Sequence, residues 1–405
     1  MAKNTYVQPS DLRALSQLLT DATIGITDLV EAVHFGILYV PGQPNLPEMG
    51  RTRGIPGLVY KSIRGVTSLV GSGVDAAWGQ VVPRLHEPPS SNEREALLAA
   101  VNGVWGDYLA ESGNALAIPM AFRLHGQIAP LEKQGLRTAV SHPTAKLAIL
   151  IHGLSMNDRQ WERQGHNHGR SLAEEFDYTP IYLHYNSGRH ISENGRDLAA
   201  LLETLCQQWP EPLQELIILG HSMGGLIARS AIHYATAANL TWPKQLQKLF
   251  TLGTPHHGAP LERNGNLVDV LLESIPHTAP FARLGKRRSA GITDLRYGNL
   301  LDEDWRGADR FAYAPDSRGI VPLPPSVQCF ALAATLGKEQ GTLKERLLGD
   351  GLVPLASALG QHTDQNRSLS FPESQQWIGF EMSHLDLLSR PEVMAQISRW
   401  LRAEG

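Results

Sequence analysis

Residues 215–234 read ELIILGHSMGGLIARSAIHY and combine an apolar run, a glycine-rich turn and a helical pattern. The run 216–219 is apolar at every position, which is typical of a strand that is buried on both faces. Beyond the turn, apolar and small residues recur about every four positions, as they do on a helix. The segment therefore predicts a strand, a sharp turn and a helix, which commits this part of the chain to an α/β arrangement.

The turn itself, Gly220-His221-Ser222-Met223-Gly224, has the form G-x-S-x-G. In a nucleophile elbow the serine has a strained backbone and projects its hydroxyl above the edge of the sheet. Glycines are needed on both sides because a Cβ would strike the neighbouring strand or helix. Most serines spaced like this lie in ordinary turns, but the flanking strand and helix favour the elbow. Ser222 is therefore the candidate nucleophile.

The same alternation of strands and helices continues from residue 115 to residue 405. Apolar runs lie at residues 117–124, 147–151, 180–184, 216–219, 249–252 and 327–332. Helical patterns separate several of them, so we predict a mostly parallel central sheet flanked by helices. Residues 1–114 instead show only helices and loops, and we expect a helical N-terminal extension. A packed extension is the default interpretation, and a cap over the active site or a surface for lipid are the alternatives.

A long insertion is predicted between two strands at residues 258–325. Its helical pattern near residues 266–275 includes Leu267, Leu271, Leu272 and Ile275 on an apolar face. Segments of this length between strands usually have a function or are disordered. We therefore expect the insertion to act as a lid.

A nucleophilic serine needs a histidine to remove its proton and a carboxylate to orient that histidine. In this architecture the acid and then the base follow the serine along the chain. Asp350, between Gly349 and Gly351 and before an apolar segment, is the favoured acid, although an Asp-Gly turn is also common. The competing carboxylates lie in the polar insertion: Asp302, Asp304, Asp309 and Asp316.

Two histidines follow Asp350 and are candidates for the base. His384 comes after the apolar run 377–380 and before a helical pattern at residues 391–400, which predicts a loop at the end of the last strand. His362 lies in a polar run that is typical of a solvated loop. We therefore favour His384.

The oxyanion of a tetrahedral intermediate needs two hydrogen-bond donors. One is normally the backbone N–H of the residue after the nucleophile, here Met223, and the other comes from the loop after an early strand. The strand at residues 147–151 ends in His152-Gly153. Because the glycine allows the backbone to turn inward, we expect the N–H of Leu154 to be the second donor. His152 is interpreted as structural, since it precedes Ser222.

Five motifs occur in one order: His152-Gly153, Gly220-His221-Ser222-Met223-Gly224-Gly225, Thr254-Pro255-His256-His257-Gly258, Asp350-Gly351-Leu352-Val353-Pro354 and His384-Leu385-Asp386-Leu387-Leu388. This set resembles the lipase-like α/β-hydrolases, and is nearest to the group that includes GPI inositol-deacylase-like proteins and bacterial lipases. The resemblance extends from about residue 115 to the C-terminus. It implies an eight-stranded sheet and ester hydrolysis through an acyl-enzyme. It also implies a triad of Ser222, Asp350 and His384, with Leu154 and Met223 at the oxyanion hole.

Composition limits the remaining classes of function. A formal charge of -4 gives no reason to expect a nucleic-acid partner. Cys206 and Cys329 form no disulfide framework in a chain of 405 residues, which fits a reduced compartment. No apolar run reaches the ~20 residues of a membrane span and no secretory signal is visible, so we expect a soluble, cytoplasmic protein. His256-His257 has no third ligand at a recognisable spacing, and we predict neither a metal nor a cofactor.

The sequence thus predicts a serine esterase or lipase that acts on a small-molecule or lipid ester, and it is compatible with peripheral contact with a lipid surface. An acyltransferase or thioesterase could use the same triad. A non-catalytic binding protein on a hydrolase fold is a further alternative, but a binding role would need no serine at the elbow. The acyl chain length, the natural substrate and the oligomeric state are not set by the sequence.

Overall fold

A computed structural model describes residues 8–38, 52, 54–82, 90–259, 288–309, 315–338 and 349–403. The chain divides into two compact units. The smaller unit comprises Met1–Arg94 and Glu111–Leu116, and the larger comprises Glu95–Ala110 and Ala117–Gly405. The larger unit thus includes most of the third helix, whereas the sequence-based division at residue 114 placed that helix with the N-terminal extension.

An eight-stranded sheet forms the centre of the larger unit, in the order β2-β1-β4-β3-β5-β6-β7-β8. β1 is antiparallel to β2 and β4, and all other neighbouring strands are parallel. The strands are β1 (Ala121–Leu124), β2 (Gln127–Ile128), β3 (Lys146–Ile151), β4 (Thr179–His184), β5 (Glu215–His221), β6 (Leu246–Leu252), β7 (Gln328–Thr335) and β8 (Gln376–Phe380). The predicted mostly parallel sheet is therefore confirmed.

Uninterrupted apolar runs occur in the strands because both faces of the sheet are covered. In β3, Leu147, Ile149 and Ile151 belong to one hydrophobic cluster, whereas Ala148 and Leu150 belong to a second cluster on the opposite face. All five side chains are fully buried. Successive side chains of a strand point to opposite faces, so only a sheet covered on both sides makes every position apolar.

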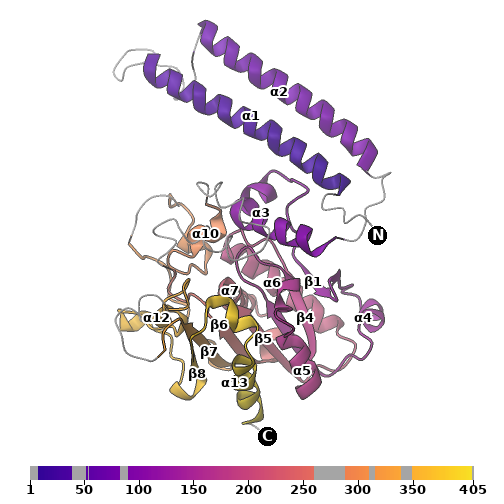
Figure 1. Ribbon diagram of the computed structural model, residues 1–405, viewed down its shortest axis with the longest axis vertical. Coiled ribbons are helices and arrows are strands. Elements are labelled where there is room, and N and C mark those ends of the chain that lie inside the picture. Colours follow the sequence, from indigo (N-terminus) through magenta and orange to yellow (C-terminus); the bar gives the residue numbers. More distant parts are fainter. Residues whose placement is uncertain are drawn as a thin grey trace. The chain divides into compact units, whose positions relative to one another are not determined.

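Helices form the two outer layers of the larger unit (Figure 1). Residues of α6 (Ile191–Gln208) and α7 (Met223–Ala237) belong to the first cluster, and residues of α5 (His168–Phe176) and α13 (Pro391–Arg402) to the second. Three short helices lie in the connections: α4 (Lys133–Ala139), α10 (Ala290–Asp294) and α12 (Leu355–Ala358). The strand order and the helical layers are those of an α/β-hydrolase fold.

The smaller unit contains two long helices, α1 (Pro9–Leu38) and α2 (Gly54–Val81), and the ends of α3 (Asn92–Glu111). α1 and α2 lie side by side as an antiparallel hairpin, since Arg13 of α1 pairs with Asp75 while Asp28 pairs with Arg64 (Figure 1). In the part of the chain that the structure describes, no helix is long and apolar enough to cross a membrane.

The insertion at residues 258–325 is described in part. The helix predicted near residues 266–275, and with it the expected lid, lies outside the described residues. The described part is fixed by buried polar contacts. Ser289 Oγ donates to the Gly103 carbonyl at 2.6 Å, and the Ala290 N–H donates to Asp107 at 3.0 Å. This portion of the insertion therefore packs against α3.

Candidate active site

Ser222 lies between the end of β5 at His221 and the start of α7 at Met223. Its backbone has φ 54° and ψ −126°, a sparsely populated region for a residue with a side chain. The Ser222 N–H donates to the Leu252 carbonyl of β6 at 2.8 Å, which fixes the turn against the sheet. The side chain makes no capping hydrogen bond to α7. The turn has the geometry of a nucleophile elbow, and it does not use the serine hydroxyl to cap the helix.

The glycines of the motif are required by close backbone approaches. A Cβ added to Gly220 would lie 2.6 Å from the Cα of Gly225, and one added to Gly224 would lie 2.3 Å from the carbonyl oxygen of Ile151. Both distances are shorter than a Cβ tolerates. The pattern G-x-S-x-G therefore reflects the tight packing of α7 on β5 and on the end of β3.

Asp350 and His384 form a buried pair. His384 Nδ1 lies 2.7 Å from Asp350 Oδ2, and the His384 N–H donates to the Asp350 carbonyl at 3.0 Å. The other carboxylate oxygen accepts from the N–H groups of Leu352 and Val353 at 3.0 and 2.8 Å. Because an ionised carboxylate only accepts hydrogen bonds, the proton of a neutral His384 is on Nδ1. His384 Nε2 is buried and has no hydrogen-bond partner, so its lone pair is free.

His221 connects the Ser222 turn to this pair. Its Nε2 lies 3.1 Å from the His384 carbonyl oxygen, and the two rings are 4.7 Å apart. A carbonyl only accepts, so His221 carries its proton on Nε2. The Ser222 hydroxyl does not bond to His384 Nε2 in this structure, although catalytic hydrogen bonds are often long without substrate. No role was assigned to His221 from the sequence alone. The position of His221 directly before Ser222 was the one sequence feature that could have indicated this contact.

The loop after β3 packs against the serine. A Cβ added to Gly153 would lie 2.9 Å from Ser222 Cβ, so only glycine allows this approach. Met223 is the first residue of α7, where N–H groups have no acceptor within the helix. Leu154 follows Gly153 in the same buried loop. The N–H groups of Leu154 and Met223, the two expected oxyanion donors, thus belong to segments next to Ser222: the loop after β3 and the first turn of α7.

α3 supports this loop from outside the sheet. Ser155 has a positive φ of 57°, and its N–H donates to Ser187 Oγ at 3.0 Å. Gly103 of α3 packs so closely that a Cβ there would lie 1.9 Å from Ser155 Oγ. Sequence reasoning missed this contact because it joins segments that are distant along the chain.

Comparison with known families agrees with the fold. Residues 143–275, which include Ser222 and the loop after β3, match a family model described as PGAP1-like alpha/beta domain. This stretch of the chain is therefore similar to PGAP1-like alpha/beta domains, in line with the α/β-hydrolase fold. No curated protein matches its sequence.

Several solved structures resemble this chain in fold. The mature form of Bacillus licheniformis lipase BlEst2 is 20% identical, with a TM-score of 0.41 over 65% of this chain and 94% of that one. Staphylococcus hyicus lipase is 14% identical, with a TM-score of 0.37 over 64% and 95%. EstA from Clostridium botulinum is 12% identical, with a TM-score of 0.38 over 64% and 87%. The roles of individual side chains are therefore inferred from this chain's own geometry.

The competing candidate residues in this chain have partners elsewhere. Asp302 binds the guanidinium of Arg196, and Asp316 pairs with Arg318 at 3.2 Å. His362 Nε2 lies 4.0 Å from the Asp316 carboxylate. These contacts give the three residues structural roles outside the Ser222 turn.

His256 and His257 hold the loop after β6. The Nδ1 of His256 lies 3.2 Å from Arg229, and the two ring nitrogens of His257 bond to Arg318 at 2.7 Å and to the Gly360 carbonyl at 2.9 Å. Their ring nitrogens are thus used within the protein, as expected for residues that shape the site.

A buried cluster of Glu95, Asp158 and His184 has the composition of a metal site. However, the guanidinium of Arg123 lies 2.8 Å from Glu95 and 3.0 Å from Asp158. Arginine cannot lose its charge in proteins and supplies the positive charge that the carboxylates need. Arg123 thus joins the cluster in an ion-pair network between α3, β1, β4 and the loop after β3.

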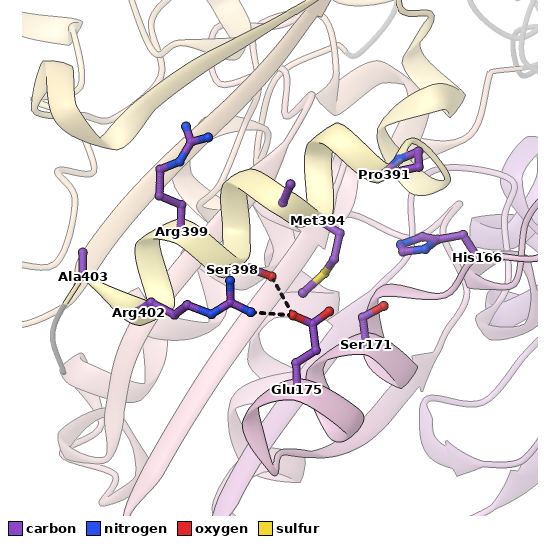
Figure 2. Close-up of a pocket in the computed structure, with 10 residues that line it drawn as sticks. His166, Ser171, Glu175, Pro391, Met394, Ser398, Arg399, Arg402 and Ala403 are labelled. Carbon is purple, nitrogen blue, oxygen red and sulfur yellow. Dashed lines mark hydrogen bonds and ion pairs between the residues drawn. The ribbon is translucent and has the colours of Figure 1, made fainter.

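A surface groove of about 800 Å³ lies between α5 and α13 (Figure 2). Glu175 in the groove binds Arg402 at 2.9 Å and Ser398 at 3.5 Å. Its lining includes neither Ser222 nor the Asp350–His384 pair. The groove is therefore not the candidate catalytic site.

Buried histidines make the stability of the protein depend on pH. Burial lowers the pKa of His152 to about 3 and that of His168 and His257 to about 4, and it lowers the pKa of His221 and His256 well below the usual value. The unfolded chain binds these protons near pH 6.5 and the folded chain does not. Stability is therefore full above pH 6.5 and falls between pH 6.5 and pH 4, by up to about 1.4 kcal/mol per pH unit for each histidine.

This dependence can be measured by urea unfolding at pH 7.5, 6.0 and 5.0. We expect His168→Gln to reduce the slope of unfolding free energy against pH by about one proton, because the amide can still donate to the Leu387 carbonyl that His168 contacts at 2.9 Å. An unchanged slope in a folded variant would contradict this explanation.

Proposed function

We propose that this protein is a serine hydrolase that cleaves carboxylic esters through an acyl-enzyme. The observation that carries the proposal is the buried Asp350–His384 pair, whose Nε2 is free and which is linked through His221 to the strained turn of Ser222. A nucleophile, a base and a group that orients the base are the elements of acyl transfer by serine.

Each group has a defined part in the proposed reaction. Ser222 Oγ attacks the ester carbonyl carbon while His384 Nε2 takes the hydroxyl proton, and Asp350 stabilises the imidazolium. The carbonyl oxygen becomes an oxyanion that accepts hydrogen bonds from the N–H groups of Met223 and Leu154. Collapse of the intermediate breaks the ester C–O bond, and His384 returns the proton to the leaving alcohol. Water then attacks the acyl-enzyme by the same route and releases the acid.

The hydrogen bonds and the neutral charge of two neighbouring histidines, His221 and His152, support His384 as the base. His221 donates from Nε2 to the His384 carbonyl, and His152 Nδ1 bonds to the Gly153 carbonyl at 2.9 Å. Burial lowers the pKa of both rings, so both stay neutral at pH 7. A neutral neighbour does not oppose the positive charge that His384 acquires when it takes the serine proton.

A panel of p-nitrophenyl esters with acyl chains of increasing length tests the activity. We expect a burst of p-nitrophenol equal to the enzyme concentration, followed by steady turnover, and labelling of Ser222 by a fluorophosphonate located by mass spectrometry. Addition of a competing alcohol or thiol separates a hydrolase from an acyltransferase, because only an acyltransferase transfers the acyl group to the acceptor in preference to water. A thioesterase would instead hydrolyse an acyl thioester faster than the matching oxygen ester. No turnover on any ester, with no label on Ser222, would refute the proposal.

A further inference from the structure

The hairpin of α1 and α2 carries its charges between the helices. The Arg13 guanidinium makes two hydrogen bonds to the Asp75 carboxylate, at 2.7 and 2.9 Å. Nearer the other end, Arg64 binds Asp28 at 3.0 Å and Glu31 at 2.5 Å. Glu31 is only 1% exposed. Ion pairs thus join the two helices at these two points, and the side chains of Arg13, Asp75 and Asp28 remain 34%, 31% and 42% exposed.

Small and hydroxyl-bearing residues complete the contact surface. A Cβ added to Gly71 would lie 2.4 Å from the side chain of Thr20, so the two helices approach closely at this point. Thr20 and Thr27 satisfy their hydroxyls on carbonyls of the preceding turn, at 3.0 and 2.8 Å. Close approach at small residues with hydroxyls bonded inside the helix is the packing that helices use in an apolar medium.

The outward surface of the hairpin is apolar. Eleven of the fifteen exposed large apolar residues in the described part of the chain lie on these two helices. They are Leu12, Leu15, Leu19, Leu58, Val59, Ile63, Val66, Leu69, Val70, Val74 and Val81. Those of α2 fall within an arc of about 160° at 100° per residue. We call the eight residues on α2 the apolar face.

Almost no charge accompanies the apolar face. At the exposed positions of α1 and α2 whose burial is described, Lys61 is the only charged residue. Surfaces of soluble proteins are commonly about 25–35% charged, which keeps them in water. An exposed apolar surface with so few charged residues indicates that the outer side of the hairpin meets an apolar environment rather than water.

We propose that the apolar face binds the surface of a lipid bilayer or lipid aggregate. Lys61 is positive and exposed on α2, so its charge is complementary to lipid phosphates. Neither helix is long and apolar enough to cross a membrane, so the hairpin lies in the interface. The choice of lipid over a second copy of the chain rests in part on the proposed function, because a lipid ester substrate would be presented at such a surface.

Flotation of the full chain with vesicles tests this inference. We expect the protein to float with phosphatidylcholine vesicles and to bind more tightly when phosphatidylglycerol is added, and Lys61→Gln should remove most of that increase. Val66→Glu with Leu69→Glu should reduce binding to phosphatidylcholine vesicles at least about 10-fold, because both side chains lie in the apolar face. The matched control, Ser68→Glu with Ser72→Glu, adds the same charge at exposed positions beside that face and should bind like the wild type.

The result of the vesicle flotation does not depend on the proposed esterase activity. Ser222→Ala should bind vesicles normally, and the Val66/Leu69 variant should keep its activity on a short soluble ester such as p-nitrophenyl acetate. Vesicle binding without ester hydrolysis would refute the proposed function and leave this inference intact. Failure of the wild type to float, or equal binding by the Val66/Leu69 variant and its control, would overturn it. A dimer that the Val66/Leu69 variant disrupts, without vesicle binding, would assign the apolar face to a second copy.

Discussion

Ser222→Ala is expected to abolish ester hydrolysis, with a loss of about 10⁴-fold or more in kcat, while the fold stays intact. The substitution removes the nucleophilic oxygen and keeps the Ser222 N–H that binds the Leu252 carbonyl at 2.8 Å. The hydroxyl makes no capping bond to α7, so its loss removes no known support of the helix. Steady-state kinetics on p-nitrophenyl esters, with thermal unfolding to verify the fold, measures both effects.

A matched control is Ser155→Ala, which changes a buried serine of positive φ in the neighbouring loop. Because Ser155 provides no attacking atom, its variant should retain burst kinetics and labelling of Ser222 even if its turnover falls. Wild-type-like hydrolysis by a correctly folded Ser222→Ala protein would rule out the proposed mechanism.

Asp350→Asn should lower kcat by about 10⁴-fold with a smaller effect on KM. The amide oxygen can keep the hydrogen bonds from Leu352 and Val353, which leaves the NH₂ group facing His384 Nδ1. An amide N–H only donates, so His384 would then accept at Nδ1 and carry its proton on Nε2. In that tautomer Nε2 cannot take the serine proton, although the site keeps its shape.

Asp302→Asn and Asp316→Asn are the comparisons for this prediction, since both carboxylates were candidates on sequence. Their partners are arginines, so their loss should affect stability more than kcat. A greater loss of kcat in either of these variants than in Asp350→Asn would show that another carboxylate orients the base.

Local sequence patterns predicted much of the framework that positions the candidate site. The apolar runs located β3 to β7 because both faces of a mostly parallel sheet are buried, and the strand order agrees with the implied eight-stranded fold. The need for Gly220 and Gly224 could be interpreted from the motif because a Cβ at either position would collide with the backbone. The Cβ would lie 2.6 Å from the Cα of Gly225 in the first case and 2.3 Å from a carbonyl oxygen of β3 in the second. The choice of Asp350 and His384 depended on their expected places at strand ends, and the structure puts them 2.7 Å apart.

Contacts between segments that are distant along the chain could not be predicted from local sequence patterns. The link from His221 to the His384 carbonyl spans 163 residues, and the support of Ser155 by Gly103 joins α3 to the loop after β3. Nothing in the local pattern of α3 distinguishes it from the N-terminal helices, and the sequence-based boundary at residue 114 separated it from the larger unit that contains most of it.

The sequence by itself determined the strand–turn–helix around Ser222, the succession of strands and the candidate acid and base, because periodicity and glycine sterics act over a few residues. Only the tertiary structure decided which polar groups meet. It brought Asp350 to His384, and it paired Arg64 of one hairpin helix with the buried Glu31 of the other. The physical reason is that the energy of a buried charge depends on the partner it finds, and that partner is chosen by packing between segments far apart in the chain.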